Sequence, residues 1–284
     1  MRLTINHRTS YQYARRIILQ AHRLVVTPRD SGDLTTLERS LHCEPEADIS
    51  WTLDVHGNLI ATATFTQPSD ELTIISHAVV DHRAPEWPIF AIDPAAHSYP
   101  FTYTLDDLID LGALAQPDWL TPGGDKVSDW ARRFVMGTQT DTLSLLKDIN
   151  SGVLGDIRYR IRDEEGTQSP AETLALGSGS CRDIAALFIE AVRHLGFGAR
   201  AVSGYLLDIG PADGNAGSTH AWAEVYLPGA GWIAFDPTHR RVGSGQLVPV
   251  AFARFNRQIM PVSGGYLGAA EDFVSMDVAV RMSE

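Results

Sequence analysis

The feature that most constrains the fold is the segment 181–195, whose apolar side chains recur with helical spacing. Gly196 stands where the C-terminal cap of such a helix belongs, and small residues precede its first turn. Three strand candidates follow, at residues 199–207, 220–227 and 231–236. One buried helix followed by strands predicts an α+β domain. The apolar stripe consists of Ile184, Leu187, Phe188, Ala191, Val192 and Leu195.

The first 83 residues instead carry short extended segments separated by turn residues, which predicts an antiparallel β-sandwich or barrel. The triplet His56-Gly57-Asn58 indicates a hairpin turn between two of them. From residue 84 to 124, frequent prolines predict a linker and surface loops. We therefore expect a sandwich-like β domain with a Pro-rich linker at residues 1–115 and a catalytic domain at residues 116–284. Residues 239–284 read as irregular chain ending in a strand at 273–281.

Composition excludes several classes of partner. The 284 residues carry a formal net charge of -12, which argues against nucleic-acid binding and against docking on an anionic membrane. The first residues lack the apolar core of a signal peptide, and no stretch has the length of a membrane span, so the expected location is the cytoplasm. Cys43 and Cys181 fall in different expected domains and are predicted to be free thiols. No signal indicates an oligomeric state.

Cys181 stands at the start of the predicted helix, where unpaired backbone N–H groups stabilise a thiolate and can donate to an oxyanion. Small residues before it, Gly179 and Ser180, would let a substrate backbone approach closely. The alternative interpretation is a buried cysteine that acts only as a small hydrophobic residue. Side chains farther along the chain favour the catalytic interpretation.

His220 and Asp236 lie on adjacent strand candidates joined by a Pro-Gly turn. A hairpin centred on Pro228 places His220 opposite Asp236, on the same sheet face. Such an imidazole, oriented by the carboxylate, can take the proton of Cys181 and return it to a leaving group. Considered alone, His220 is equally consistent with a strand residue whose hydrogen bonds are satisfied, and Asp236 with a turn residue. The same register pairs Trp222 with Ala234 and Glu224 with Trp232.

Two other arrangements use some of these residues. Cys181, His220, Asp236 and His239 include zinc-ligand types, but they lack close ligand spacing, so no metal site is predicted. Trp222 either lines the acyl site or packs across the sheet. Cys43 has no partner in sequence and is expected to be structural.

The segments Gly177-Ser-Gly-Ser-Cys181-Arg-Asp, Leu195 to Tyr205, His220-Ala-Trp-Ala-Glu-Val and Gly231 to Thr238 resemble the transglutaminase-like superfamily. Leu3 to His7, Tyr11-Gln-Tyr13 and the Gly57-Asn58 turn resemble the β-rich domain that precedes this core in bacterial members. The resemblance implies a papain-like core, a helix bearing the cysteine packed on an antiparallel sheet. It also implies a Cys181–His220–Asp236 triad and no cofactor.

This sequence departs from the common pattern of that superfamily at Ser180 and Gly198, which leaves the triad intact. Gln168 is a candidate for an additional oxyanion donor. We expect Cys181 to attack an amide of a peptide or protein substrate, with hydrolysis favoured, as in a cysteine peptidase or amidase. The alternatives are amine transfer, as in a protein-glutamine cross-linking transglutaminase, and a non-catalytic binding protein that keeps the fold.

Overall fold

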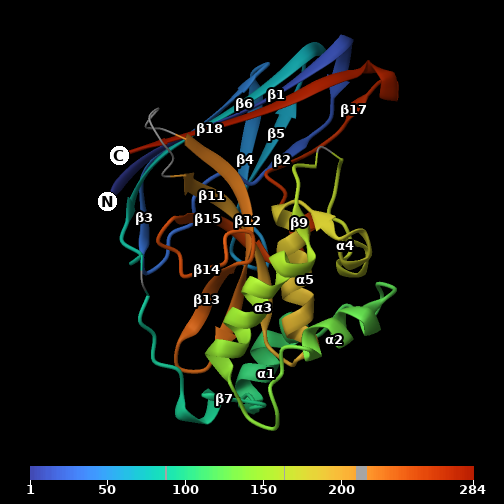
Figure 1. Cartoon of the computed structure of the whole chain (residues 1–284). Coiled ribbons are helices and arrows are strands. Elements are labelled where there is room, and N and C mark those ends of the chain that lie inside the picture. The colour runs from blue at the N-terminus through green and yellow to red at the C-terminus, as the bar shows by residue number, and fades with distance from the viewer. Residues whose placement is uncertain (87, 163, 209–215) are drawn as a thin grey trace.

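The computed structural model describes residues 1–86, 88–162, 164–208 and 216–284 (Figure 1). Its largest sheet has the strand order β14-β13-β12-β18-β1-β6-β3, and β11 and β15 continue from β12. Both chain termini lie at one end of this sheet, because the last strand pairs with the first (Figure 1). The strands are β1 Arg2–Leu19, β3 Leu34–Glu44, β6 Ser69–His82, β11 Ala199–Asp208, β12 Ala216–Leu227, β13 Gly231–Asp236, β14 Arg241–Val242, β15 Leu247–Ala253 and β18 Phe273–Ser283.

A smaller sheet packs against the N-terminal part of the large one. Its order is β16-β2-β5-β4, with bounds Val262–Ser263, His22–Leu24, Leu59–Phe65 and Ala47–Leu53. Leu24, Ala61 and Leu72 belong to the apolar core shared by the two sheets, and Cys43 is buried there as a free thiol. The predicted turn joins β4 to β5, and Gly57 adopts a φ of 70° in it. This arrangement confirms the expected N-terminal β layer.

Helix α5, Cys181–His194, packs against β11 and β12 on one side and contacts helices α2, α3 and α4 (Figure 1). Its apolar stripe is buried as predicted, and Phe188 stacks on Phe235 of β13 at 5.5 Å between ring centroids. The remaining helices are α1 Leu105–Leu111, α2 Gly124–Arg132, α3 Thr142–Asp156 and α4 Pro170–Leu176. Among the described residues, no helix has the length and apolar character needed to cross a bilayer.

Three predictions about secondary structure need correction. The expected linker contains helix α1, which begins at the N-cap Thr104 despite the nearby prolines. Residues 247–253, expected to be irregular, form β15, because their side chains are mostly buried against β11. Residues 3–5 and 11–13, expected to be two separate short strands, are parts of one strand, β1, which pairs on both sides.

The C-terminal tail is built into the N-terminal sheets. β16 pairs with β2, β17 (Tyr266–Leu267) with β1, and β18 with β1 along most of its length. The predicted final strand, 273–281, is thus confirmed. Because β18 also contacts β12, the sheet of the N-terminal region is continuous with the strands that carry the site described next.

Candidate active site

Cys181 is the first residue of α5, and the residue before it holds the helix start in place. The backbone N–H and the hydroxyl of Ser180 both donate to Oδ2 of Asp183, each at 2.8 Å. The bond from the backbone N–H satisfies one of the donors that a helix start otherwise leaves unpaired. The thiol therefore lies on a fixed first turn whose remaining N–H groups point outward.

Asp183 is the anchor of this first turn. It is fully buried and also accepts from the backbone N–H of Gln168 and from Nε of Arg162, each at 2.8 Å. Burial by itself would raise the pKa of this carboxyl, but the hydrogen bonds from Ser180 and Arg162 outweigh it and lower the pKa. The helix-start aspartate is thus an ionised structural group that positions Cys181.

His220 and Asp236 come from neighbouring strands, but their register differs from the prediction. Ala223 opposes Phe235, and the loop between the strands is Pro228–Ala230. The prediction was wrong by two residues, because a turn centred on Pro228 alone is too short to close the hairpin. A shift of two preserves side-chain parity, so His220 and Asp236 still share a face. The same shift corrects the other two expected pairs: Glu224 opposes Ala234, and Trp232 opposes Tyr226.

His220 and Asp236 are in direct contact. Nε2 of His220 lies 2.9 Å from Oδ2 of Asp236, and both side chains are buried. The same oxygen lies 2.8 Å from Nδ1 of His239, while Oδ1 accepts from the backbone N–H groups of Thr238 and His239. Asp236 therefore has a full set of donors, which fixes the orientation of its carboxylate.

The electrostatics favour a thiolate–imidazolium pair. Burial by itself would lower the pKa of His220, but its hydrogen bonds with Asp236 and Cys181 outweigh burial and raise the pKa to about 10. Burial by itself would raise the pKa of Cys181. The hydrogen bond with His220, the charge of that ring and the N–H of Ala221 lower the pKa instead. Burial by itself would raise the pKa of Asp236, but its hydrogen bonds with His220 and His239 hold that pKa well below its usual range.

The other predicted site residues lie close to this centre but have structural contacts. Trp222 is buried behind His220, with the two rings stacked at 6.1 Å between centroids. Gly179 is needed for packing, since a Cβ there would lie 2.8 Å from that of Asp183. Gln168 is buried, and its side-chain oxygen accepts from the hydroxyl of Thr173 at 3.3 Å. The structure thus gives these three residues packing or anchoring contacts; a role toward substrate remains a prediction.

Sequence reasoning missed two residues at this centre. His239 had appeared only in the zinc alternative, although its three-residue spacing from Asp236 was visible. Tyr159 lies in the two-residue strand β9, Arg158–Tyr159, and pairs with Gly179 of β10, Ser178–Gly179. Burial raises the pKa of Tyr159, and so does its proximity to Cys181. No sequence pattern indicated that this tyrosine approaches the sulfur.

His220, Asp236 and His239 also bring three potential metal-ligand atoms within 4.8 Å of one another. Two ligands of one zinc ion, each bonded at about 2.1 Å in tetrahedral geometry, are about 3.4 Å apart. The two N···O separations here are 2.9 and 2.8 Å, which are hydrogen-bond distances. The donor set therefore fits a hydrogen-bonded network better than a metal centre.

Comparisons with known proteins agree with this geometry. Residues 128–237 match the transglutaminase-like superfamily, and residues 3–81 match the bacterial transglutaminase-like N-terminal region. The chain belongs to the transglutaminase-like superfamily. Both resemblances drawn from the sequence motifs are thereby confirmed.

Relatives of this transglutaminase-like chain align along nearly its whole length. An uncharacterised protein of Mycobacterium tuberculosis is 28% identical over 98% of this chain and 91% of its own. One from Mycobacterium leprae is 23% identical over 99% and 98%. The crystal structure of a candidate cysteine protease from Cytophaga hutchinsonii superposes with a TM-score of 0.77 and 22% identity, covering 99% of this chain and 90% of that one. The α+β architecture of this chain is thus also that of a solved structure.

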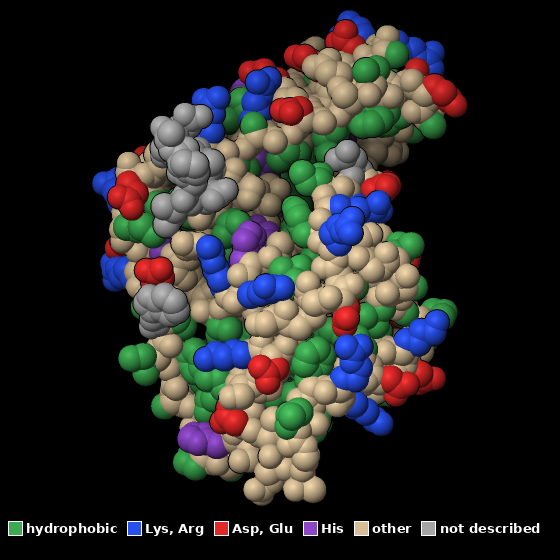
Figure 2. Space-filling view, in the orientation of Figure 1, with side chains coloured by type: hydrophobic (Ala, Val, Ile, Leu, Met, Phe, Trp, Pro, Cys, Tyr) green, Lys and Arg blue, Asp and Glu red, His purple; other side chains and the backbone are tan. Residues whose placement is uncertain are grey.

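Two cavities flank helix α5 and the strands that carry His220 and Asp236. One, of about 600 Å³, has Asp236 in its wall together with Glu86 and residues of α3, β14 and the segment 88–90. It belongs to the face on which a histidine lies at the centre, between Lys and Arg side chains (Figure 2). This cavity therefore adjoins the His220–Asp236 pair.

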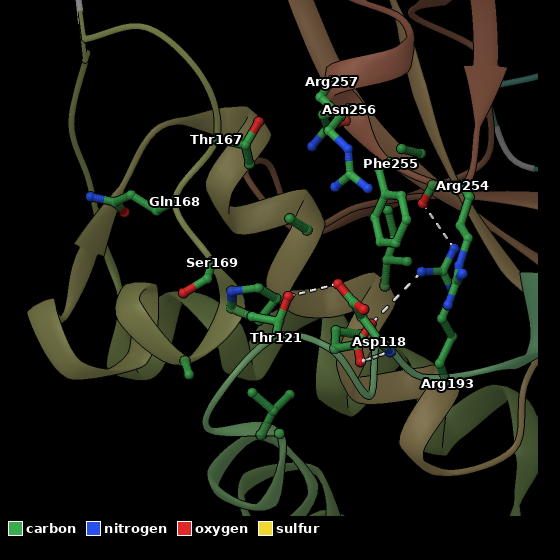
Figure 3. Close-up of a pocket in the computed structure, with 18 of the residues that line it drawn as sticks. Asp118, Thr121, Thr167, Gln168, Ser169, Arg193, Arg254, Phe255, Asn256 and Arg257 are labelled. Atoms are coloured by element: carbon green, nitrogen blue, oxygen red, sulfur yellow. Dashed lines mark hydrogen bonds and ion pairs between the residues drawn. The ribbon is translucent and has the colours of Figure 1, made fainter.

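The other cavity, of about 380 Å³, lies along α5, and its described lining includes no member of the triad. Arg193 and Arg254 gather near Asp118 at one end, and the Gln168 side chain points away from them (Figure 3). Arg193 is buried and donates to the backbone oxygens of Ala199 and Arg254 at 2.8 and 2.9 Å. These bonds tie the end of α5 to the neighbouring strands, which is a structural role.

Proposed function

We propose that this protein is a thiol-dependent amide hydrolase, a cysteine peptidase or amidase, with Cys181 as nucleophile, His220 as acid and base, and Asp236 as the residue that orients His220. The single observation that carries the proposal is the position of His220. This buried imidazole is hydrogen-bonded to Asp236 through Nε2, at 2.9 Å, and the thiol of Cys181 contributes to raising its pKa. A buried imidazole that is held by a carboxylate and is coupled to a thiol at a helix start is the arrangement that activates a cysteine nucleophile.

In the first half of the reaction, the Cys181 thiolate attacks the carbonyl carbon of the substrate amide and a C–S bond forms. The carbonyl oxygen becomes an oxyanion, for which the N–H groups of the first turn of α5 are suited donors. The His220 imidazolium then gives its proton to the amide nitrogen as the C–N bond breaks. An amine leaves, and the acyl group stays on sulfur as a thioester.

In the second half, neutral His220 takes a proton from water as the water oxygen attacks the thioester carbonyl. The C–S bond breaks, a carboxylic acid leaves, and the thiolate–imidazolium pair is restored. Asp236 stays ionised throughout, since its pKa lies well below its usual range. A primary amine in place of water would make the same site a transferase, and that outcome is included in the test.

Tyr159 is the candidate for the additional oxyanion donor that the sequence left to Gln168. It is about half exposed, at 47%, and lies on the strand that pairs with Gly179, two residues before the nucleophile. A phenolic hydroxyl on the strand paired with Gly179 is available to a carbonyl oxygen of bound substrate. The side chain of Gln168, in contrast, is bonded to Thr173.

The test begins with the rate at which iodoacetamide alkylates Cys181 as a function of pH, measured by intact mass. We expect rapid alkylation below pH 7 in the wild-type protein, because its thiol pKa is lowered, and much slower alkylation in His220→Ala. Cys43 is an internal control: burial raises its pKa to about 11, so it should react slowly. Alkylation of Cys181 typical of an ordinary thiol, unaffected by His220→Ala, would instead support a binding protein.

The reaction itself is tested by incubating the protein with a peptide library that contains glutamine, with and without a primary amine. Release of new peptide termini or of ammonia, without amine incorporation, supports hydrolysis. Incorporation of the amine contradicts hydrolysis and identifies a transferase. Cys181→Ser is the control, since it keeps the fold and removes the thiolate.

A further inference from the structure

The cavity of about 600 Å³ beside Asp236 is not used by the chemistry described above. It lies between α3, the β14–β15 connection, Glu86 and the segment 88–90, and it belongs to the same face as the central histidine (Figure 2). Asp236 lines this cavity and also contacts His220, so the cavity lies beside the candidate active site. An extended peptide advances about 3.3 Å per residue, so a subsite here would take a side chain near the reacting amide.

The cavity wall is cationic although the whole protein is acidic. Lys147, Arg240 and Arg241 line it, against the acidic residues Glu86 and Asp236. Asp236 is already engaged by two imidazoles, so its charge is compensated within the triad. The whole chain has a net charge of -12, so three positively charged side chains around one cavity give this site a local charge opposite in sign to that of the protein.

Two of these cations have no bonded partner within the part of the chain that the structure describes. Lys147 and Arg240 are exposed and take part in no hydrogen bond or ion pair there, while Arg241 donates to the side chain of Gln246. Arg240 is also the one non-glycine residue with positive φ among the described residues, at 55°. In this left-handed backbone conformation, a residue with a side chain costs about 1 kcal/mol or more relative to glycine. A positive charge is thus present at a backbone position that glycine would occupy with less strain.

The rest of the lining is suited to contact the methylene groups of an acidic side chain. Leu143, Leu206 and Leu247 supply apolar surface, and Asn150 adds a polar group at the wall. Asn150 is 1% exposed, and its side-chain oxygen has no hydrogen-bond partner within the described chain. An unpaired buried acceptor at a cavity wall is free to receive an N–H or O–H of a bound molecule.

We propose that this cavity is a substrate subsite that binds a carboxylate, so that the preferred substrate is an acidic peptide with a Glu or Asp within a few residues of the amide that is cleaved. Lys147 and Arg240 bind the carboxylate, and the leucines contact its methylene groups. This inference rests on the proposed function, because it assigns part of the substrate of the same Cys181 centre. It does not depend on whether water or an amine resolves the thioester.

The experiment uses pairs of peptides in which a thiol-reactive epoxide replaces one amide bond. Within each pair, one position near the epoxide carries Glu or Gln, and the set scans positions on both sides. The readout is the second-order rate of Cys181 modification by intact mass. The ratio of the Glu rate to the Gln rate, taken within one protein, cancels differences in thiol reactivity between variants.

For the wild-type protein, we expect at least one Glu peptide to react about three- to tenfold faster than its Gln partner, the range for one or two partly exposed ion pairs. This ratio should fall towards one in Lys147→Gln/Arg240→Gln. It should also fall at about 1 M salt, where the Debye length is about 3 Å. Arg240→Lys keeps the charge and should keep most of the preference.

Arg39→Gln is the matched control, because it removes one positive charge from β3, remote from the cavity lining. It should leave the ratio unchanged. A ratio of one or less at every position overturns the inference, and so does a preference that survives in the double variant. Failure of the proposed function is a separate result, because it appears in the His220-independent alkylation of Cys181 by iodoacetamide.

Discussion

Nδ1 of His239 lies 2.8 Å from the same Asp236 oxygen that Nε2 of His220 contacts at 2.9 Å. One buried carboxylate oxygen is therefore shared by two imidazoles, the buried ring of the proposed triad and a ring at the surface, with a side-chain exposure of 34%. His239 does not contact the reacting atoms directly. It is a positioning residue for Asp236, and through it for His220.

Replacing His239 by Ala should destabilise the protein by about 1 kcal/mol at pH 7, because it removes a hydrogen bond to an ionised group. That bond lowers the pKa of Asp236. A depressed carboxyl pKa contributes stability above the unfolded value, near 4, and loses it as pH falls through the folded value. The loss in free energy of unfolding should therefore be complete from pH 7 to about pH 4 and become smaller at lower pH. Urea unfolding at several pH values measures it. His239→Asn, which keeps a donor, should recover part of the loss; a penalty that grows in acid contradicts the assignment.

Peptide hydrolysis should follow a bell-shaped pH dependence whose alkaline limb lies near pH 10. The leaving amine takes its proton from the His220 imidazolium, and the pKa of this group is raised to about 10. Since the Asp236 hydrogen bond contributes to this rise, the limb should move to lower pH in Asp236→Asn. The measurement is kcat/KM against pH for both proteins. A limb at the same pH in the variant would show that Asp236 does not set the basicity of His220.

Arg162→Ala should cost about 3 kcal/mol in free energy of unfolding, because it leaves the fully buried Asp183 carboxylate without its cation. Arg2→Ala is the matched control. It breaks an ion pair with Glu38 in which both side chains are more than half exposed, and it should cost less than about 1 kcal/mol. Urea unfolding at neutral pH measures both. Equal costs would contradict the anchoring role of Asp183.

Gly204→Ala should destabilise the protein by about 3 kcal/mol or more and slow the reaction of Cys181. A Cβ at this position of β11 would overlap the backbone oxygen of Val248 and lie 2.7 Å from the Trp222 ring, directly beside His220. Gly155→Ala in α3 is the control, since nothing lies within 4 Å of its added Cβ. That change should be neutral or stabilise by up to about 1 kcal/mol. Thermal unfolding with iodoacetamide kinetics distinguishes the two.

Tyr159→Phe should lower kcat/KM for amide cleavage by about tenfold or more, since loss of an oxyanion donor acts on the transition state. Alkylation of Cys181 by iodoacetamide forms no oxyanion and should change much less. Tyr99→Phe, a substitution of a tyrosine stacked on Phe197, is the control. Equal loss in the two assays of Tyr159→Phe would assign the tyrosine to packing around the thiol.

The helix and strands near the candidate site could be predicted from the sequence, because the patterns that indicate them extend over only a few residues. The helical stripe gave α5 with its first residue at Cys181, and alternation gave the bounds of β13. The hairpin register was wrong by two residues. Even so, parity still placed His220 and Asp236 on one face, because alternation depends only on whether a residue number is odd or even.

By itself, the sequence determined helix α5, the strands that follow it and which three residues are candidates for the triad, since periodicity and helix-start chemistry act over a few residues. The tertiary structure alone decided that the last strand pairs with the first. It also brought His239, Tyr159 and the Lys147–Arg240 cavity to the same centre. Such contacts join segments that are far apart in the chain. They depend on which apolar faces of helices and sheets pack against one another, and no local sequence pattern encodes that packing.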